Sequence, residues 1–251
     1  MKQLPLAISP PLQPTLDNFV RGGNAAALEH LRNMPLVAAL HAAGLAGLTA
    51  PAGEPGRSAP AGAPTVPVPP VYLWGPEGCG KSHLMRGLAA RVADAGLPVG
   101  WFMARDAVPW VLQPEWALVV IDDCESMDAA AQHAAFVLFT EAVTHGVPLA
   151  AAGRLPPADL RLRDDLRTRL AWGHVFALQP LSEADTCEAM ATEARRRGFD
   201  LPPEVSSYLL SRFPRDLGTL MKLLAALDNH SLATSRRLTV PLVRDLITRS
   251  P

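Results

Sequence analysis

The sequence has little of what would place a protein in a membrane, in a disulfide scaffold or directly on a nucleic acid. Only three of its 251 residues are cysteines, and none forms a C-x-x-C pair, so neither a disulfide framework nor a zinc site is expected. No apolar run reaches the roughly 18 residues of a membrane span, and the proline-rich N-terminus is unlike a signal peptide. The net charge of −1 lacks the basic excess typical of a nucleic-acid-binding surface. These absences favour a cytoplasmic protein with reduced thiols and no membrane contact.

Two segments rich in proline are expected to lack regular structure. Residues 1–16 contain four prolines, which forbid a regular helix, and are interpreted as an extended tail. Residues 49–70 contain seven prolines and three glycines with almost no bulky apolar side chains, so they cannot bury enough surface to fold. Because this flexible segment directly precedes the first predicted core strand, we interpret it as an insertion into a domain of residues 17–179.

The strongest motif of the chain follows this insertion. Val71–Trp74 is a short apolar run rich in β-forming residues, and the next residues, GPEGCGKS, fit the phosphate-binding-loop pattern G-x-x-x-x-G-K-[ST]. The glycines let backbone N–H groups converge on an anion, the lysine reaches the β- and γ-phosphates, and the serine hydroxyl binds Mg²⁺. A helix-like stretch after the loop directs its positive end at the phosphates. The residues predicted to bind ADP or ATP here are Gly75, Gly78, Gly80, Lys81 and Ser82.

Strands and helices alternate after this loop, which is typical of a parallel α/β sheet. Further strands are predicted at 98–103, 117–121, 147–152 and 175–178, with helices at 106–113 and 129–144. A helix is also expected at 24–34, capped by Asn24. From residue 180 only helices are predicted, beginning at a Ser182-x-x-Asp185 capping box, and they form a second domain of residues 180–251.

Two acidic residues follow the predicted strand 117–121. Asp122 emerges where ligands of open α/β sheets bind, and we predict that it holds Mg²⁺. Asp123 is a candidate for polarising an attacking water. Two acids can also simply end a strand, but one βαβ interval after a phosphate loop they favour the metal role.

From Asp17 to Ile247 the chain resembles the AAA+ ATPases of the DnaA branch, and more closely the Hda group within it. The resemblance is carried by DNFVRGGN, YLWGPEGCGKSHL, RLAWGHVFALQPLSEAD, RRRGFDLPPEV and RRLTVPLVRDLI. It implies a five-stranded parallel sheet with an all-helical lid. It also implies that Phe19, Val20 and Asn24 lie near the adenine, although core packing explains Phe19 equally well. Arg215 matches the lid arginine that contacts the nucleotide phosphates in this family.

The same resemblance places an arginine finger in the segment LRDDLRTRLAWG. Arg169 matches it by its position before LAWG, and such an arginine enters a neighbouring subunit's site to stabilise the transferred phosphoryl group. The segment also contains Arg161, Arg163 and Arg167, and the residues alone barely select one of the four. Arg167 is therefore the alternative.

The N-terminal residues QLPLAI resemble the peptide that docks on the bacterial sliding clamp, the β subunit of DNA polymerase III. A short extended peptide can bury apolar side chains in pockets while an amide forms oriented hydrogen bonds. The residues assigned to clamp binding are Gln3, Leu4, Leu6 and Ile8. The chain ends at Pro251 without the helix-turn-helix domain of DnaA, so contact with DNA is expected only through the clamp.

Two departures from the family pattern predict slow hydrolysis at the protein's own site. The strand 147–152 ends in alanines, where the family tends to place a polar residue, and Asp123 stands where many AAA+ motors use Glu. The resemblance therefore implies a negative regulator of replication initiation, which binds ADP, docks on the DNA-loaded clamp and uses Arg169 to accelerate hydrolysis of ATP on DnaA. A self-sufficient ATPase such as a helicase loader and a phosphate-loop kinase are the alternatives, and association into homo-oligomers stays open.

Overall fold

The computed structural model describes residues 13–35, 68–213, 216–234 and 238–249. The clamp-binding motif of Gln3, Leu4, Leu6 and Ile8 lies outside these ranges, as do most of the expected insertion 49–70 and Arg215.

Five parallel strands form one sheet in the order β2-β3-β4-β1-β5. Their bounds are β1 Val71–Trp74, β2 Val99–Met103, β3 Leu118–Asp122, β4 Leu149–Gly153 and β5 His174–Ala177. This sheet confirms the predicted fold class. Every residue of β3 and β4 is buried, which explains their continuous apolar sequences. Because all strands run in one direction, the carboxyl ends of β1, β3 and β4 meet at one edge, where the candidate site lies.

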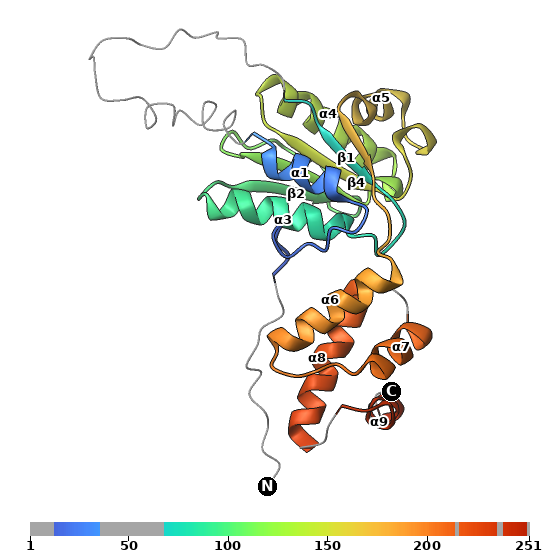
Figure 1. Cartoon of the computed structure of the whole chain (residues 1–251). Helices are drawn as coiled ribbons and strands as arrows, with labels where there is room; N and C mark the ends of the chain where they lie inside the picture. The colour runs from blue at the N-terminus through green and yellow to red at the C-terminus, as the bar shows by residue number, and fades with distance from the viewer. Residues whose placement is uncertain (1–12, 36–67, 214–215, 235–237, 250–251) are drawn as a thin grey trace, which may run out of the picture.

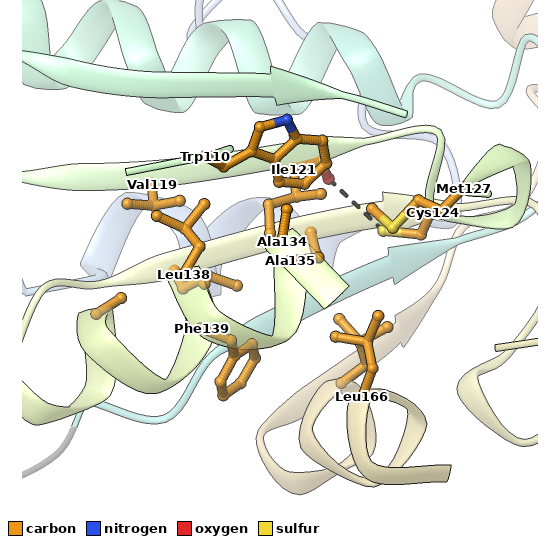
Figure 2. Close-up of a cluster of buried hydrophobic side chains, with 14 of the residues drawn as sticks. Trp110, Val119, Ile121, Cys124, Met127, Ala134, Ala135, Leu138, Phe139 and Leu166 are labelled. Atoms are coloured by element: carbon orange, nitrogen blue, oxygen red, sulfur yellow. Dashed lines mark hydrogen bonds between the residues drawn. The ribbon is translucent and has the colours of Figure 1, made fainter. Parts of the chain in front are cut away.

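Helices cover both faces of the sheet (Figure 1). One hydrophobic core joins the sheet to α1 (Ala25–Asn33) and α3 (Lys81–Asp94), and a second core joins the other face to α4 (Ala129–Thr144) and α5 (Asp164–Trp172). Figure 2 shows Leu138 and Phe139 of α4 in this second core, together with Ile121 of β3 and Leu166 of α5. The bounds predicted for α4 are confirmed.

Four helices form the lid, a group with a hydrophobic core of its own that lies below the sheet in Figure 1. They are α6 (Glu183–Arg196), α7 (Pro203–Arg212), α8 (Leu217–Thr234) and α9 (Val240–Arg249). The predicted capping box starts α6, since Ser182 Oγ accepts from the Asp185 amide at 3.1 Å while Asp185 Oδ2 accepts from the Ser182 amide at 3.3 Å. Within the described ranges, no helix is long and apolar enough to cross a bilayer.

A helix predicted at 106–113 is wrong, because this segment forms no regular structure. Pro109 removes a backbone donor in its middle, and Trp110 is drawn into the second core, where it stacks on Phe102 with ring centroids 5.0 Å apart. The exposed flanking residues Val108 and Val111 show that the segment lacks the one-sided burial of a surface helix.

Asn24 and helix α5 also differ from expectation. Asn24 precedes α1, but its side chain makes no capping hydrogen bond and instead binds the backbone of Gln179. The sequence analysis assigned no helix to α5, because its mainly polar sequence buries only Leu166 and Leu170. Both outcomes depend on partners that lie far away in the sequence.

Candidate nucleotide site

The phosphate loop connects β1 to α3 and is enclosed by two other segments. Gly78 and Gly80 have φ values of 78° and 101°, which side chains of L-residues rarely adopt. A Cβ on Gly80 would lie 2.7 Å from Cε2 of Phe19, and one on Gly78 would lie 2.6 Å from Cβ of Asp216. The motif glycines therefore let the N-terminal residues and the start of α8 pack directly against the loop.

Lys81 is held inside this loop by the loop's own backbone. Its Nζ donates to the carbonyl oxygens of Gly75 at 2.7 Å and of Pro76 at 2.9 Å. The ammonium therefore sits where the loop curves, the place at which it can exchange these carbonyls for phosphate oxygens. Cys79 Sγ lies 3.7 Å from the same ammonium and is buried.

Ser82 and Asp122 meet at the carboxyl edge of the sheet. Ser82, in the first turn of α3, donates from its hydroxyl to Asp122 Oδ2 at 3.0 Å. Asp122 is only 5% exposed, and its Oδ1 accepts from the Asp123 amide at 2.9 Å. Hydroxyl and carboxylate oxygens are hard ligands of the kind Mg²⁺ prefers, and Mg²⁺ usually keeps waters and phosphate oxygens besides. Within the described ranges, no set of three or more Cys, His, Asp or Glu is grouped for a metal.

Asp123 lines a different part of this edge from Asp122, which is bonded to Ser82. The backbone of Asp123 is in the left-handed region, with φ of 58°, and it begins the short η2 turn (Cys124–Ser126). It lines a cleft of about 360 Å³ with Ala104, Arg105 and Asp128, at the ends of β2 and β3. The structure thus brings Asp122, but not Asp123, against the phosphate loop.

Arg154 is a residue of this edge that the sequence analysis missed. It directly follows β4, and Glu125 binds it twice, accepting from its Nε at 3.1 Å and from its backbone amide at 3.1 Å. Its Nη2 also lies 3.8 Å from Glu77 of the phosphate loop. The rule that selected Asp122, a charged residue directly after an apolar strand, would have found Arg154 as well.

The space around Gly153, the last residue of β4, leaves no room for a side chain. A Cβ there would collide with the Tyr72 hydroxyl and would lie 3.0 Å from Glu125 Oε2. The Tyr72 hydroxyl donates to the Leu155 carbonyl at 2.9 Å, and burial holds the pKa of this phenol well above its usual range. The end of β4 therefore carries no polar side chain before Arg154.

The residues matched to the adenine lie between the loop and the lid. Phe19 is packed on Gly80 and on His83, whose ring centroid is 5.5 Å away. Asn24 is 3% exposed and is bonded to Gln179, which follows β5, while Val20 is half-buried. Asp216, the described neighbour of Arg215, touches Gly78, so the first turn of α8 borders the phosphate loop.

The four arginines of the predicted finger segment differ in their partners. Arg163 binds Asp165 at 2.6 Å, and Arg167 binds Asp164 at 2.7 Å, whereas Arg161 is exposed. Arg169 instead lies over the rings of Phe136 and Phe139, with its guanidinium carbon 4.8 Å and 5.9 Å from their centroids. Among the described residues, these rings are the contacts of its guanidinium, so its N–H donors are not engaged by a carboxylate.

Comparison with known proteins agrees with this geometry. Residues 183–247 match the family model of the Hda lid domain. The fold is similar to domain III of the replication initiation protein DnaA from Thermotoga maritima, with 20% identity, a TM-score of 0.66, and coverage of 96% of this chain and 100% of that chain.

The chain has the fold of DnaA domain III, and its helical lid matches the Hda lid-domain family.

Two further solved structures are similar to this chain in fold. AMPPCP-bound DnaA from Aquifex aeolicus is 19% identical with a TM-score of 0.59, and the match covers 86% of this chain and 66% of that chain. The RuvB Holliday junction branch migration motor from Thermotoga maritima is 15% identical with a TM-score of 0.55, covering 88% and 68% of the two chains. These likenesses show the fold, and the family match shows that the lid is similar to the Hda lid domain.

Proposed function

We propose that this protein is a cytoplasmic negative regulator of replication initiation, which binds ADP and Mg²⁺ itself and stimulates hydrolysis of the ATP bound to DnaA. The observation that carries the proposal is the state of Arg169. Arg163 and Arg167 are each paired with an acid, although Arg163 also lies 5.7 Å from the centroid of the Phe136 ring. Arg169 lies closer to that ring, at 4.8 Å, and among the described residues it has no acid partner. A guanidinium held on a ring face keeps its N–H donors for an anion.

Arg169 would complete the ATP site of DnaA in trans. As the γ-phosphoryl group leaves, negative charge spreads over its oxygens, and a planar guanidinium that donates two hydrogen bonds to them lowers the barrier. Such an arginine accelerates hydrolysis by roughly 10³–10⁵-fold in related phosphoryl-transfer systems. The product, ADP-bound DnaA, is the inactive form expected from the family resemblance.

The protein's own nucleotide would have a structural rather than a catalytic task. Lys81 and the loop amides would hold its phosphates, Ser82 and Asp122 its Mg²⁺, and Arg215 would report its presence to the lid. Slow turnover is expected because the all-buried β4 ends without a polar side chain and Asp123 faces another cleft. The clamp would be bound by Gln3, Leu4, Leu6 and Ile8, so DNA would be reached only indirectly.

A self-sufficient AAA+ ATPase such as a helicase loader is the second candidate. Arg154 favours it, because a cation at the end of β4 beside Glu77 could contact the terminal phosphate of the protein's own ATP. Steady-state ATP turnover of the purified protein, without DnaA or clamp, separates the two candidates.

The decisive experiment measures hydrolysis of ATP preloaded on DnaA, in the presence of clamp on DNA and this protein. Arg169→Ala is expected to reduce the stimulated rate by about 10³-fold, the lower range for loss of an arginine finger. Arg167→Ala is the matched control, because it removes an arginine of the same helix that is already paired with Asp164. Full stimulation by Arg169→Ala would contradict the assignment of Arg169 as the arginine finger.

The tail is tested separately in a clamp pull-down. Replacing Gln3 and Leu4 with Ala should abolish recovery of the protein on clamp beads, since it removes the oriented amide and one apolar anchor. Unchanged recovery would remove the tail from the mechanism and leave the role of Arg169 to be judged alone.

A further inference from the structure

Residues 13–24, here called the N-terminal strap, connect the tail of residues 1–12 to the body of the protein. Their first half forms a closed turn. The Thr15 amide donates to Asn18 Oδ1 at 2.9 Å, the Asn18 amide donates to Thr15 Oγ1 at 3.2 Å, and Asn18 Nδ2 donates to the Gln13 carbonyl at 2.9 Å. The strap therefore has a defined conformation where the tail joins it.

His83 of α3 fastens this turn to the phosphate-loop helix. Its Nε2 lies 3.0 Å from the Thr15 carbonyl and 2.9 Å from Asn18 Oδ1, and both of these are acceptors. The orientation of the Asn18 amide is fixed by its other bonds, so Nε2 must carry the proton that the two oxygens share. His83 follows Ser82 directly, which places this fastening one residue from the predicted Mg²⁺ ligand.

Close packing reinforces the same contact. Leu16 is 6% exposed, and a Cβ on Gly87 of α3 would lie 2.8 Å from its backbone nitrogen. Phe19 lies on Gly80 of the phosphate loop. Arg32 of α1 donates to the Leu16 carbonyl at 3.2 Å and to Asp17 at 3.0 Å. The first half of the strap thus rests on the loop and on the helix that the loop opens.

The second half of the strap is fastened to the connection between sheet and lid. Asn24 Nδ2 donates to the Gln179 carbonyl at 2.9 Å, and the Gln179 amide donates to Asn24 Oδ1 at 2.8 Å. A Cβ on Gly22 would lie 2.8 Å from Leu181 Cδ2. Gln179 and Leu181 lie between β5 and α6, the segment through which the lid is joined to the sheet.

We propose that the N-terminal strap is a nucleotide-responsive link, through which the state of the phosphate loop and lid controls the tail. One end of the strap is fixed to the loop helix and the other to the lid connection. A change of lid angle moves the Gln179 end of the strap but not the His83 end. The strap residues between these two ends must then lose or strengthen their hydrogen bonds and packing contacts. That this movement matters for clamp binding rests on the proposed function.

The link itself is tested by hydrogen exchange of the full chain, read on peptides covering residues 13–24, without nucleotide, with ADP and Mg²⁺, and with AMPPCP and Mg²⁺. We expect exchange at Thr15, Asn18 and Asn24 to differ by about tenfold between nucleotide states, as when hydrogen bonds of this kind open locally. Equal exchange in all three states would overturn the proposal.

Three variants separate coupling from nucleotide binding. In His83→Ala the exchange of residues 13–19 should be fast in every state, while ADP affinity measured by calorimetry stays within about twofold, since no phosphate ligand has been removed. His83→Gln, whose amide can donate from the same position, should restore the nucleotide dependence. Asn18→Ala removes the other partner and should match His83→Ala. Retained dependence in both alanine variants overturns the link.

Clamp binding then distinguishes a failure of the link from a failure of the proposed function. For the unaltered chain, clamp affinity should change between ADP and AMPPCP, and His83→Ala should remove that difference. A clamp affinity that is the same with either nucleotide overturns the control of the tail. Absence of clamp binding in every state refutes the proposed function, while a nucleotide-dependent exchange of the strap would stand without it.

Discussion

The charged groups of the phosphate loop are paired within the chain, whereas, among the described residues, that of Arg169 is not. Arg169 of α5, with the rings of Phe136 and Phe139 of α4 beneath it, is here called the Arg169 surface. In the loop, Lys81 is bonded to two carbonyls and Ser82 to Asp122, so these groups already have partners within the chain. Arg169 lies on the ring of Phe136, and its N–H donors have no carboxylate partner among the described residues. Under the proposed function, the loop would hold its ligand alone, whereas the Arg169 surface would meet an anion that another protein presents. Four experiments test this contrast.

Lys81→Ala should cause the largest change in ADP affinity, without altering the contacts of Arg169 with Phe136 and Phe139. Removing a charge-assisted contact to the phosphates is expected to weaken ADP binding by about 100-fold, or ~3 kcal/mol. Isothermal titration calorimetry measures the affinity, and Arg169→Ala is the control that should bind ADP normally. A loss of equal size in the control would mean that the two regions are not separate.

Asp122→Asn tests whether the Ser82–Asp122 pair holds Mg²⁺. The amide keeps an acceptor for Ser82 but loses the negative charge, so ADP affinity in Mg²⁺ should fall by about tenfold, or ~1.4 kcal/mol. Affinity in EDTA should barely change, because the carboxylate does not touch the phosphates directly. An equal loss with and without Mg²⁺ would indicate a structural role for Asp122.

Phe136→Ala removes the ring under Arg169 and under Arg163, but Arg163 keeps its pairing with Asp165, so the larger effect is expected at Arg169. A cation–π contact at a partly exposed site contributes about 1 kcal/mol, so stimulated hydrolysis on DnaA should fall roughly fivefold. Phe136→Tyr keeps the ring and should retain most of the stimulation, while both variants should bind ADP like the unaltered protein. If alanine and tyrosine behave alike, the ring does not position Arg169.

The smallest expected effect is a pH dependence confined to the loop side. Burial lowers the pKa of His83, and nearby Arg86 lowers it further against the opposing hydrogen bond to Thr15. Because the unfolded chain takes up this proton first as the pH falls below about 6.5, the strap contact is fully stable at neutral pH and weakens on acidification. Exchange of residues 13–19 should therefore rise modestly from pH 7.5 to 5.5, and His83→Gln should remove the rise. A rise that persists in that variant would assign it to another group, such as His30, whose pKa is also lowered by burial and by His174.

The features that could be predicted from the sequence are those determined by residues close to one another along the chain. The phosphate loop, the strand that ends at Asp122, helix α4 and the capping box at Ser182 each depend on residues within a few positions of one another. Their patterns therefore predicted the sheet and the phosphate-binding edge without knowledge of the remaining chain.

The remaining features depend on distant partners. Asn24 was expected to cap α1, but it is bonded to Gln179, 155 positions away. The acids that bind Arg163 and Arg167 are close to them in sequence, but the ring of Phe136 that contacts Arg169 comes from another helix, α4. Arg154 follows a run of alanines, which by themselves do not indicate a charged site. The glutamates that bind it, Glu77 and Glu125, lie on other elements.

The crowding at Gly153 restricts how this protein can evolve. Any side chain at this position meets the Tyr72 hydroxyl, so a polar group cannot be introduced there unless Tyr72 changes as well. Each substitution made alone is harmful, since the first creates a collision and the second leaves the Leu155 carbonyl without its donor. A lineage that starts from this sequence must therefore cross a less stable intermediate before it gains a polar side chain at the end of β4.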